Sequence, residues 1–350
     1  MKILYIGSIN GNTKLTLHSL KKMYKEVDYI DTYKILPFHN LSNRIFYHLS
    51  PKLFEKYIDY FFQNKINKKY DLVFINNSEF ITNGVIDYLK KNTKKILFYC
   101  SDNPFVNRDK KRWYFFKGNL KKYDLVVFPI KSRLKFAKAN GLKKFISVIP
   151  PYYNDIISKN KLKIDKKIKY KNDIVFVGTW FPERGRFFSK LKKLGLNFKI
   201  YGSRWDKDKE HYNYLKKNIV LENLSVEKYS KIIQTSKIAI SLLSKGNVDD
   251  ITLRCIEIPA LGTLLCSEYT KTIQNLLKNK LEAVYFRNPN ECFTICTKLL
   301  KNKHLIKKIS KNGNYKVTKI LKAESENILR KMILIAFKNN KNINKFIYKF

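Results

Sequence analysis

Two acidic residues eight positions apart are the strongest chemical signal in this 350-residue sequence. Asp249 and Glu257 precede a Pro-Ala-Leu-Gly turn that ends at Gly262, and a short apolar strand, residues 263–266, follows it. A loop acid, a helix with an inward-facing Glu257 and a glycine at the helix end are typical of polar groups held at the edge of an open α/β sheet. Ligands bind at such edges. The segment therefore predicts a ligand site.

Glu257 itself has two interpretations. It lies among apolar neighbours, and a buried carboxylate needs a partner. Arg254, one helical turn earlier, could be that partner in a purely structural ion pair. Alternatively, a hydroxyl-rich ligand such as a ribose could bind there, because a carboxylate accepts hydrogen bonds from two hydroxyl groups. The spacing alone favours neither interpretation.

A glycine-containing loop, residues 7–13, follows the first predicted strand and precedes the first predicted helix. It offers flexible backbone and N–H donors at a helix N-terminus. The loop lacks the G-x-G-x-x-G spacing, so it is either a simple strand-to-helix turn or an acceptor-side loop facing a ligand cleft. In the second case its contacts would come from Gly7, Ser8, Gly11 and Asn12.

The second half of the chain opens with a similar loop. Gly178 ends an apolar strand, and Arg184 and Arg186 enter the helix that follows. Arginine near a helix N-terminus opposes the helix dipole. An anion bound at this place would resolve the conflict, whereas two solvated arginines would need no ligand.

The elements that position these residues follow from the hydrophobic pattern. Short β-rich runs alternate with amphipathic helical stretches over the first 150 residues, which predicts a parallel, doubly wound sheet. The predicted strands are 2–6, 27–31, 72–76, 95–100, 125–129 and 145–149. Predicted helices include 13–24 and 50–64, the latter with Leu53, Tyr57, Tyr60 and Phe61 on one side.

The second half repeats this alternation after Pro150-Pro151 and a lysine-rich segment, 159–171. We therefore predict an α/β protein with domains 1–150 and 173–316, a linker 151–172, and a C-terminal part, 317–350, whose helix 317–338 packs back across the domains. The predicted strands of the second domain are 173–177, 197–201, 238–242, 263–266 and 283–286, and its helices are 186–194, 270–278, 290–302 and 304–312.

The net charge of +43 would attract nucleic acid, anionic lipid headgroups or phosphorylated substrates. Lys, Asn, Ile, Tyr and Phe are all abundant, as in proteins of AT-rich genomes. We therefore assign no function to half of the excess positive charge and assign the other half to attraction to a membrane surface. Residues 110–116 could hold the protein at a membrane, or their aromatic side chains could pack inward. No stacking or groove-reading motif is present, so nucleic acid is not an expected partner.

The five cysteines show neither paired C-x-x-C nor Cys/His ligand spacing, which favours reduced core thiols and no metal. The apolar run at the N-terminus is too short for a signal peptide, and no stretch of 18 uninterrupted apolar residues occurs. We therefore expect a cytoplasmic protein, which the basic surface could hold at the inner face of the membrane.

Several of these motifs together resemble those of GT-B glycosyltransferases, and more narrowly of the CgeB-like spore-maturation glycosyltransferases. The resemblance extends from about residue 173 to 315 and rests on Val177-Gly178 and on the series Gly246, Asp249 or Asp250, Arg254, Glu257, Ala260 and Gly262. It implies two Rossmann-like domains facing a central cleft, with a nucleotide-diphosphate sugar as donor substrate and no cofactor.

The resemblance also implies roles for individual residues. Glu257 would bind the donor ribose, and Asp249, in place of the first Glu of an E-x7-E motif, would contact the transferred sugar. Arg184, before Gly185, matches a basic residue that holds the diphosphate, whereas Thr179 replaces a second one. The donor-binding residues would be Gly178, Thr179, Arg184, Gly202, Asp250, Arg254, Glu257, Gly262 and Thr263.

In the first domain, residues 96–104 resemble a strand end where related enzymes carry a His-Asp pair. Ser101 stands in place of the histidine, so Asp102 would be the catalytic base if its pKa were raised. An Asp-Asn-Pro turn without catalytic function is the alternative.

The first domain has no DxD motif at a strand end. We therefore expect a metal-independent transfer of a sugar to a hydroxyl group of a surface glycan or lipid-linked acceptor. A non-catalytic sugar-nucleotide-binding relative and a basic nucleic-acid-binding protein are the alternative functions.

Overall fold

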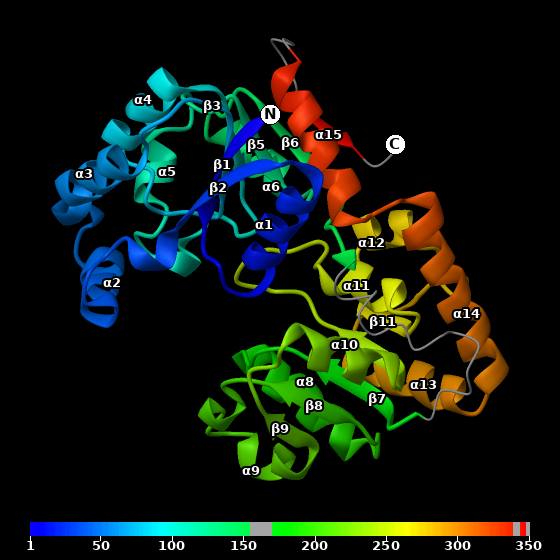
Figure 1. Cartoon of the computed structure of the whole chain (residues 1–350). Coiled ribbons are helices and arrows are strands. Elements are labelled where there is room, and N and C mark those ends of the chain that lie inside the picture. Colours follow the sequence, from blue (N-terminus) through cyan, green and yellow to red (C-terminus); the bar gives the residue numbers. More distant parts are fainter. Residues whose placement is uncertain (155–169, 339–343, 348–350) are drawn as a thin grey trace. The chain divides into compact units, whose positions relative to one another are not determined.

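The computed structural model describes residues 1–154, 170–338 and 344–347. Its contacts divide the chain into two units (Figure 1). Unit 1 comprises residues 1–149, 245–249 and 325–350, and unit 2 comprises residues 150–244 and 250–324. The first division, after Ile149, lies one residue from the boundary expected from the sequence. Residues 155–169 of the predicted linker lie outside the described residues.

Unit 1 is built on a parallel sheet with the strand order β13-β6-β5-β4-β3-β1-β2. Its inner strands are mostly apolar runs, which is the pattern expected when both faces of a parallel sheet are covered by helices. They are β1 (Lys2–Gly7), β2 (Glu26–Asp31), β3 (Tyr70–Asn76), β4 (Thr93–Tyr99), β5 (Leu125–Phe128), β6 (Phe145–Val148) and β13 (Asn344–Ile347).

Alternate residues of these strands enter two apolar clusters, one on each face of the sheet. Leu4 and Ile6 belong to the cluster that also contains side chains of α3 (Glu55–Lys65), α4 (Asn83–Asn92) and α5 (Tyr114–Gly118). Ile3 and Tyr5 belong to the other, which α1 (Gly11–Met23) and α15 (Ser325–Phe337) cover. The remaining helices of unit 1 are α2 (His39–His48), α6 (Arg133–Ala139) and the short 3-10 helices η1 (Thr32–Lys34), η2 (Pro51–Phe54) and η3 (Asn107–Asp109).

Unit 2 contains a second parallel sheet, with the order β12-β11-β10-β7-β8-β9. Its strands are β7 (Asn172–Val177), β8 (Lys199–Gly202), β9 (Ile219–Leu221), β10 (Ser236–Ser241), β11 (Leu264–Glu268) and β12 (Val284–Phe286). The α-helices are α8 (Pro182–Lys193), α9 (Tyr212–Leu215), α10 (Val226–Gln234), α11 (Arg254–Ala260), α12 (Lys271–Leu276), α13 (Pro289–Leu300) and α14 (Lys303–Tyr315), and the shorter turns are η4 (Trp205–Lys207), η5 (Lys216–Asn218) and the π-helix η6 (Lys316–Ile320).

The predicted strands of both sheets are present, whereas β9 and β13 were not predicted. The predicted helix 317–338 is wrong as a single element, because the chain forms η6, turns at Lys322, whose φ is +45°, and resumes as α15. Segment 50–64 forms η2 and α3, and the buried side chains of α3 are Ile58 and Phe62. Of the predicted stripe Leu53, Tyr57, Tyr60 and Phe61, the first three are exposed, whereas Phe61 is partly buried and packs against the core.

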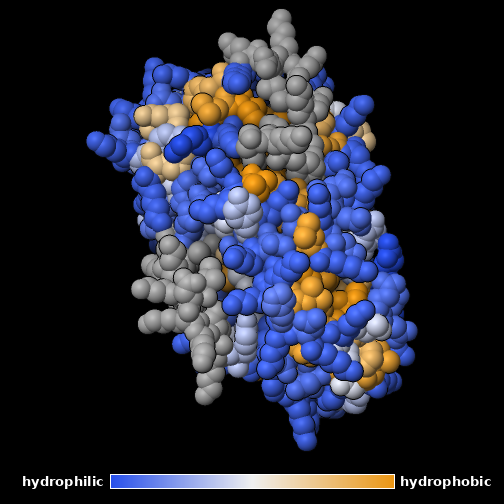
Figure 2. All heavy atoms as spheres, turned by 90° about the vertical axis from the view of Figure 1, so that its right-hand side faces the viewer, coloured by the Kyte–Doolittle hydropathy of each residue, from blue (hydrophilic) through white to orange (hydrophobic). Residues whose placement is uncertain are grey.

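The face of the molecule in Figure 2 is mostly hydrophilic, with smaller hydrophobic areas between the polar residues, as the high lysine content leads one to expect. No helix in the described parts of the chain is both long enough and apolar enough to cross a membrane.

Candidate functional site

Glu257 lies on α11 in unit 2, and its carboxylate is buried, with 1% of the residue exposed. The hydroxyl of Tyr229, on α10, donates to Glu257 Oε2 over 3.0 Å. Arg254, one turn before Glu257, pairs with the same oxygen, and its guanidinium lies 4.0 Å from the centre of the Tyr229 ring. The three side chains form one polar cluster in which Oε2 receives both donors.

The second oxygen of this carboxylate, Glu257 Oε1, is buried and has no hydrogen-bond partner among the described residues. A buried acceptor without a donor costs about 1–3 kcal/mol, and more when it is charged. Burial raises the pKa of Tyr229 well above its ordinary value, so the phenol stays a neutral donor. The cluster is therefore missing one donor, which a ligand hydroxyl could supply.

The turn after Glu257 has a structural explanation. Gly262 follows the end of α11 with φ +83°, and its N–H donates to the Pro259 carbonyl while the Thr263 N–H donates to the Ile258 carbonyl. These two bonds form a Schellman motif, which glycine favours because it adopts positive φ without strain. The Thr263 hydroxyl donates to Ile233 O over 2.7 Å. Carbonyls of α11 thus occupy the amides of Gly262 and Thr263, and donor binding by these two residues stays a prediction.

The structure brings together the predicted donor residues Gly178, Thr179, Arg184 and Gly202 at the carboxyl ends of β7 and β8. A Cβ atom on Gly202 would lie 2.1 Å from the Gly178 carbonyl oxygen, so only glycine allows the two strand ends to approach. Arg184 is buried and donates from Nη1 to Thr179 O over 2.6 Å. Its guanidinium also lies 4.7 Å from the centre of the Phe181 ring.

Asp249 belongs to unit 1, because residues 245–249 are part of that unit. Its carboxylate pairs with Arg133 of α6, a side chain with no exposed surface. Arg133 Nη1 also donates to the Val248 carbonyl over 3.1 Å. Burial raises the pKa of Asp249 to about 6, although Arg133 acts in the opposite direction. Asp249 is thus a titratable acid whose position is fixed by a buried arginine.

Asp102 follows β4 and lies in a network of four donors. Asn77 Nδ2 lies 2.9 Å and Arg112 Nη1 3.1 Å from Oδ2, while Arg108 Nη2 lies 3.0 Å and Asn247 Nδ2 3.4 Å from Oδ1. Burial would raise the pKa of Asp102, but Arg112, Asn77 and Arg108 outweigh it and hold the pKa below its ordinary value. The condition that we set for Asp102 as a base, a raised pKa, is therefore not met.

Sequence reasoning missed the partners of both acids. Arg108 and Arg112 lie in or next to the basic segment that we had assigned to a membrane surface, and Arg133 is 116 residues from Asp249. Asn77 follows β3 with φ +58°, a conformation in which asparagine is enriched, but nothing in the sequence connects it to Asp102.

Asp250, the next residue after Asp249, belongs to unit 2. It accepts hydrogen bonds at the start of α12, from the Thr272 hydroxyl to Oδ2 and from the Thr270 hydroxyl to the backbone carbonyl, each over 2.6 Å. Neighbouring acids thus belong to different units, and Asp250 shares its unit with Glu257.

The predicted acceptor-side loop lies at the carboxyl end of β1. A Cβ atom on Gly7 would lie 3.0 Å from the Asn76 carbonyl oxygen, so the loops after β1 and β3 approach closely. Ser8 Oγ accepts from the Asn10 N–H over 3.3 Å, and Gly11 begins α1 with φ +54°. The carbonyl of Asn12 accepts from the Thr16 hydroxyl over 3.2 Å. These contacts form a turn into α1, and an acceptor-binding role for the loop stays a prediction.

All five cysteines are buried free thiols, as predicted. Three of them meet in the core of unit 2, where Cys266 Sγ lies 3.9 Å from Cys296 Sγ and Cys292 Sγ lies within 4.8 Å of both. Cys292 and Cys296 are one helical turn apart on α13, and Cys266 is on β11. A thiophilic ion could bind three such sulfur atoms, a possibility that a search for C-x-x-C spacing overlooks.

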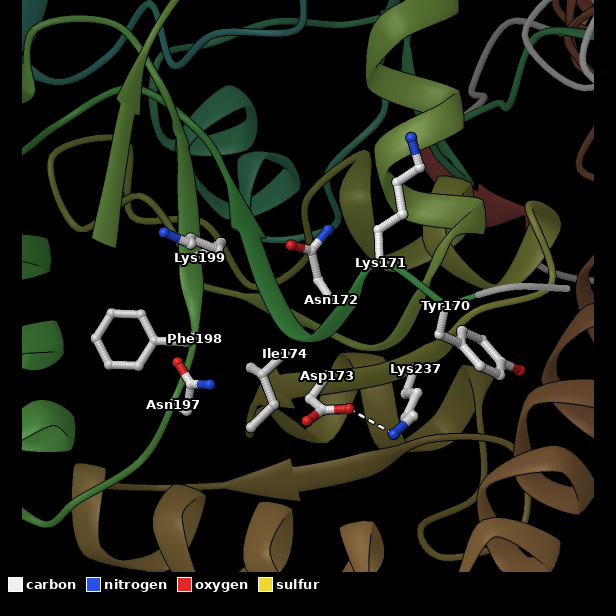
Figure 3. A pocket seen from close by; sticks show the side chains of 9 residues that line it. All are labelled: Tyr170, Lys171, Asn172, Asp173, Ile174, Asn197, Phe198, Lys199 and Lys237. Atoms are coloured by element: carbon white, nitrogen blue, oxygen red, sulfur yellow. Dashed lines mark ion pairs between the residues drawn. The ribbon is translucent and has the colours of Figure 1, made fainter. Parts of the chain in front are cut away.

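A pocket of about 210 Å³ lies at the opposite end of the unit 2 sheet, where β7, β8 and β10 begin (Figure 3). Lys171, Lys199 and Lys237 contribute to its lining, and the Lys237 ammonium pairs with Asp173 over 2.5 Å. None of the predicted site residues line this pocket. Because ligands of parallel α/β sheets bind at the carboxyl ends of the strands, we do not assign the donor site to it.

Comparison with solved structures identifies the architecture. A sucrose-phosphate synthase from Thermosynechococcus elongatus superimposes with a TM-score of 0.67 over 96% of this chain and 98% of its own, at 10% sequence identity. The fold is GT-B. Anabaena Alr3699/HepE in complex with UDP and glucose superimposes with a TM-score of 0.64 over 95% of this chain and 98% of its own, at 11% identity. Identities this low establish the GT-B fold alone.

The sequence comparisons are more restricted. Residues 184–326 match a family described as glycosyl transferase-like, which is less than half of the chain but includes Arg184, Arg254 and Glu257. A tetraacyldisaccharide 4'-kinase from Rickettsia canadensis is 36% identical over 94 residues, 26% of either chain. The kinase from Rickettsia akari is 36% identical over 108 residues, 30% of either chain. The chain thus matches less than a third of the length of these curated relatives.

Taken together, the GT-B fold and the family match support a glycosyltransferase. The narrower CgeB-like resemblance stays a prediction.

Proposed function

We propose that the protein transfers a sugar from a nucleotide-diphosphate sugar to a hydroxyl group of a surface glycan or lipid-linked acceptor. The observation that carries this proposal is the buried Glu257 carboxylate, which lies in the family-matched segment and lacks one donor at Oε1. A ribose hydroxyl supplies such a donor, and Tyr229 and Arg254 already fix the other oxygen. A solved GT-B neighbour was crystallised with UDP and glucose, which supports a donor of this class.

The remaining roles follow from charge. When the bond between the sugar and the diphosphate breaks, negative charge develops on the leaving group, and the Arg184 guanidinium would stabilise it without a divalent ion. The acceptor hydroxyl must lose its proton to a base. Asp249, whose pKa is about 6, is better suited to proton transfer near neutral pH than Asp102, whose pKa is lowered.

A thermal-shift screen against UDP-, GDP-, ADP-, CMP- and dTDP-sugars tests donor binding. We expect one nucleotide class to raise the melting temperature of the wild type, and Glu257→Gln to weaken its binding by about tenfold to a hundredfold, because a hydrogen bond to a charged group is lost. Glu227→Gln, an exposed change on α10 close to Tyr229, is the matched control. Equal responses of Glu257→Gln and the wild type would refute the ribose assignment.

Transfer itself needs a separate measurement, because a non-catalytic relative would bind the donor equally well. Release of the nucleoside diphosphate from the donor identified in the screen is measured with a panel of hydroxyl acceptors, in the presence and absence of EDTA. We expect turnover that EDTA does not abolish. Donor binding without release under any acceptor would favour the binding protein, and loss of turnover with EDTA would contradict metal independence.

We also propose that part of the basic surface holds the protein at a membrane where a lipid-linked acceptor is presented. For residues 110–116 the sequence left two interpretations, a membrane-binding surface or aromatic side chains that pack inward. Trp113, Phe115 and Phe116 are buried in unit 1, so the aromatic side chains pack inward, which was the alternative interpretation.

A further inference from the structure

Unit 1 carries an unusual concentration of exposed apolar side chains between residues 38 and 60. Phe38 is 85% exposed, Leu53 69%, Leu49 62% and Leu41 61%. They belong to α2, η2 and the residues flanking these elements, and α3 adds the exposed Tyr57 and Tyr60. We call these six residues the α2–α3 surface. In Figure 1, α2 and α3 are the blue helices at the left margin.

These side chains are not needed for the core. The same elements already bury Phe46, Ile58 and Phe62, each without exposed surface, in the cluster beneath them. Single exposed apolar residues are normal on soluble proteins, but contiguous groups of large ones mark surfaces that bind something. The outer side of α2 and α3 is thus a candidate interaction surface.

Positive charge surrounds the middle of this surface. Arg44, Lys52 and Lys56 are exposed on the same elements. Two lysines arrive from the segment after η3: Lys110 Nζ lies 2.9 Å from His48 Nδ1, and Lys111 Nζ donates to the Leu49 carbonyl. The Lys52 ammonium lies 5.9 Å from the centre of the half-exposed Tyr114 ring. Five cations therefore lie on these elements or contact them.

The acidic groups of these helices do not neutralise that charge. Asp59 turns toward α4, where its carboxylate accepts a hydrogen bond from the hydroxyl of Thr82, the residue that caps that helix. Glu55, at the start of α3, is the other carboxylate on α2, η2 and α3. With Asp59 engaged at α4, Glu55 is the remaining carboxylate of these elements, so the surface is both apolar and basic.

We propose that the α2–α3 surface binds an anionic lipid bilayer. Leucine side chains enter the boundary between headgroups and acyl chains, and the surrounding lysines contact lipid phosphates, as in amphipathic helices that lie in a membrane interface. The inference rests on the proposed function in one respect, since a lipid-linked acceptor would be presented at the same bilayer. The proposal also assigns a function to some of the many lysines of this chain.

Vesicle flotation of the full chain tests the surface without any nucleotide sugar. Phosphatidylcholine vesicles are compared with vesicles that also contain phosphatidylglycerol. We expect binding to the anionic vesicles alone, weakened by salt. Leu49→Ser/Leu53→Ser should reduce the affinity at least about tenfold, and Lys52→Gln and Lys56→Gln about fivefold each, since one lysine near an anionic membrane contributes about that factor.

Two exposed apolar residues elsewhere provide matched controls. Leu334 on α15 and Ile320 on η6 are 57% and 54% exposed, and Leu334→Ser and Ile320→Ser should bind vesicles like the wild type. Melting curves of all variants, recorded without vesicles, show whether each one folds.

Failure of the wild type to bind anionic vesicles would overturn the proposal, as would equal losses in the control variants. Self-association that Leu49→Ser/Leu53→Ser abolishes, without vesicle binding, would assign the surface to a second copy of the chain instead. Donor binding is measured in solution without lipid, so a failure of the lipid proposal is distinguishable from a failure of the glycosyltransferase assignment.

Discussion

Two carboxylate–arginine pairs, one in each unit, use the same chemical groups in different ways. In unit 2, Glu257 is buried but its partner Arg254 is 34% exposed, and Oε1 lacks a partner among the described residues. In unit 1, Asp249 pairs with an arginine that has no exposed surface and that also holds the Val248 carbonyl. The first pair is incomplete in the way expected of a binding site, whereas the second fixes a loop and sets the protonation of an acid.

The largest expected effect comes from removing the buried arginine. Arg133→Met leaves the Asp249 carboxylate without its cation and the Val248 carbonyl without one donor, and breaking a buried pair in this way costs about 3–5 kcal/mol. Arg254→Met should cost less, because the Arg254 side chain is 34% exposed and Tyr229 still donates to Glu257 Oε2. Urea unfolding at neutral pH gives both free energies of unfolding. An Arg254→Met loss equal to or larger than that of Arg133→Met would contradict the distinction between the pairs.

The second prediction concerns pH. Raising the pH should change the stabilising contributions of Asp249 and Asp102 in opposite directions. The pKa of Asp249 is raised to about 6, so its stabilising contribution is fully present below pH 4 and is lost as the pH rises through 6. The pKa of Asp102 is lowered, so its contribution is present above pH 4 and is lost below it, as the pH falls through the folded-state value.

Free energies of unfolding measured from pH 3 to pH 8 for the wild type, Asp249→Asn and Asp102→Asn separate these two contributions. The advantage of the wild type over Asp249→Asn should shrink by up to about 3 kcal/mol between pH 4 and pH 7. Its advantage over Asp102→Asn should shrink only toward the acid end. A parallel pH dependence of the two differences would remove the basis for assigning the proton-transfer role to Asp249.

Tyr229→Phe tests how the Glu257 carboxylate of unit 2 is positioned. It removes the neutral donor to Glu257 Oε2 and leaves Arg254 as the sole donor to that oxygen among the described residues. We expect a loss of about 1–2 kcal/mol of stability and a weaker thermal shift with the donor, because the carboxylate is less firmly oriented. Tyr214→Phe, a half-exposed tyrosine on α9, is the control. Wild-type donor binding in Tyr229→Phe would show that Arg254 alone positions Glu257.

The sequence predicted the parts of this arrangement that depend on neighbouring residues. Buried parallel strands are continuous apolar runs, so the strands of both sheets could be predicted from the sequence. The one-turn spacing of Arg254 and Glu257 allowed their ion pair as one of two interpretations, and the structure forms it. The Asp249–Arg133 pair joins residues 116 positions apart, and the donors around Asp102 come from three loops. Contacts of that kind depend on tertiary structure and leave no local pattern.

The exposed side of α3 shows a different limit of sequence reasoning. Residues 50–64 contain two apolar stripes, and periodicity reveals that they exist without revealing which one faces the core. The sequence analysis singled out the stripe with Leu53, Tyr57, Tyr60 and Phe61, but the structure fully buries Ile58 and Phe62 and partly buries Phe61. Because the segment is apolar on both sides, the side that does not face the core, with Leu53, Tyr57 and Tyr60, is exposed and can take part in a surface interaction.

The smallest expected effect comes from Val248, in the unit 1 loop that carries Asp249. The prediction tests whether this loop is held in an unfavourable backbone conformation. Val248 has φ +56°, a left-handed conformation that is unfavourable by about 1–2 kcal/mol for most residues and especially for a β-branched one. Its carbonyl receives Ser132 Oγ over 2.9 Å and Arg133 Nη1 over 3.1 Å, and these donors hold the backbone in place. The side chain is 43% exposed and contributes little to packing.

Val248→Asn should therefore stabilise the protein by about 1 kcal/mol, because asparagine tolerates this backbone conformation. Val220→Asn, a similarly exposed valine in the extended backbone of β9, is the control and should be neutral or destabilising. Urea unfolding measures both. If Val248→Asn stabilises the protein and preserves turnover, the valine is merely unfavourable there. If stability rises while turnover falls, the valine side chain or the loop conformation that it enforces contributes to the position of Asp249, and the unit 1 pair then has a function beyond fixing the fold.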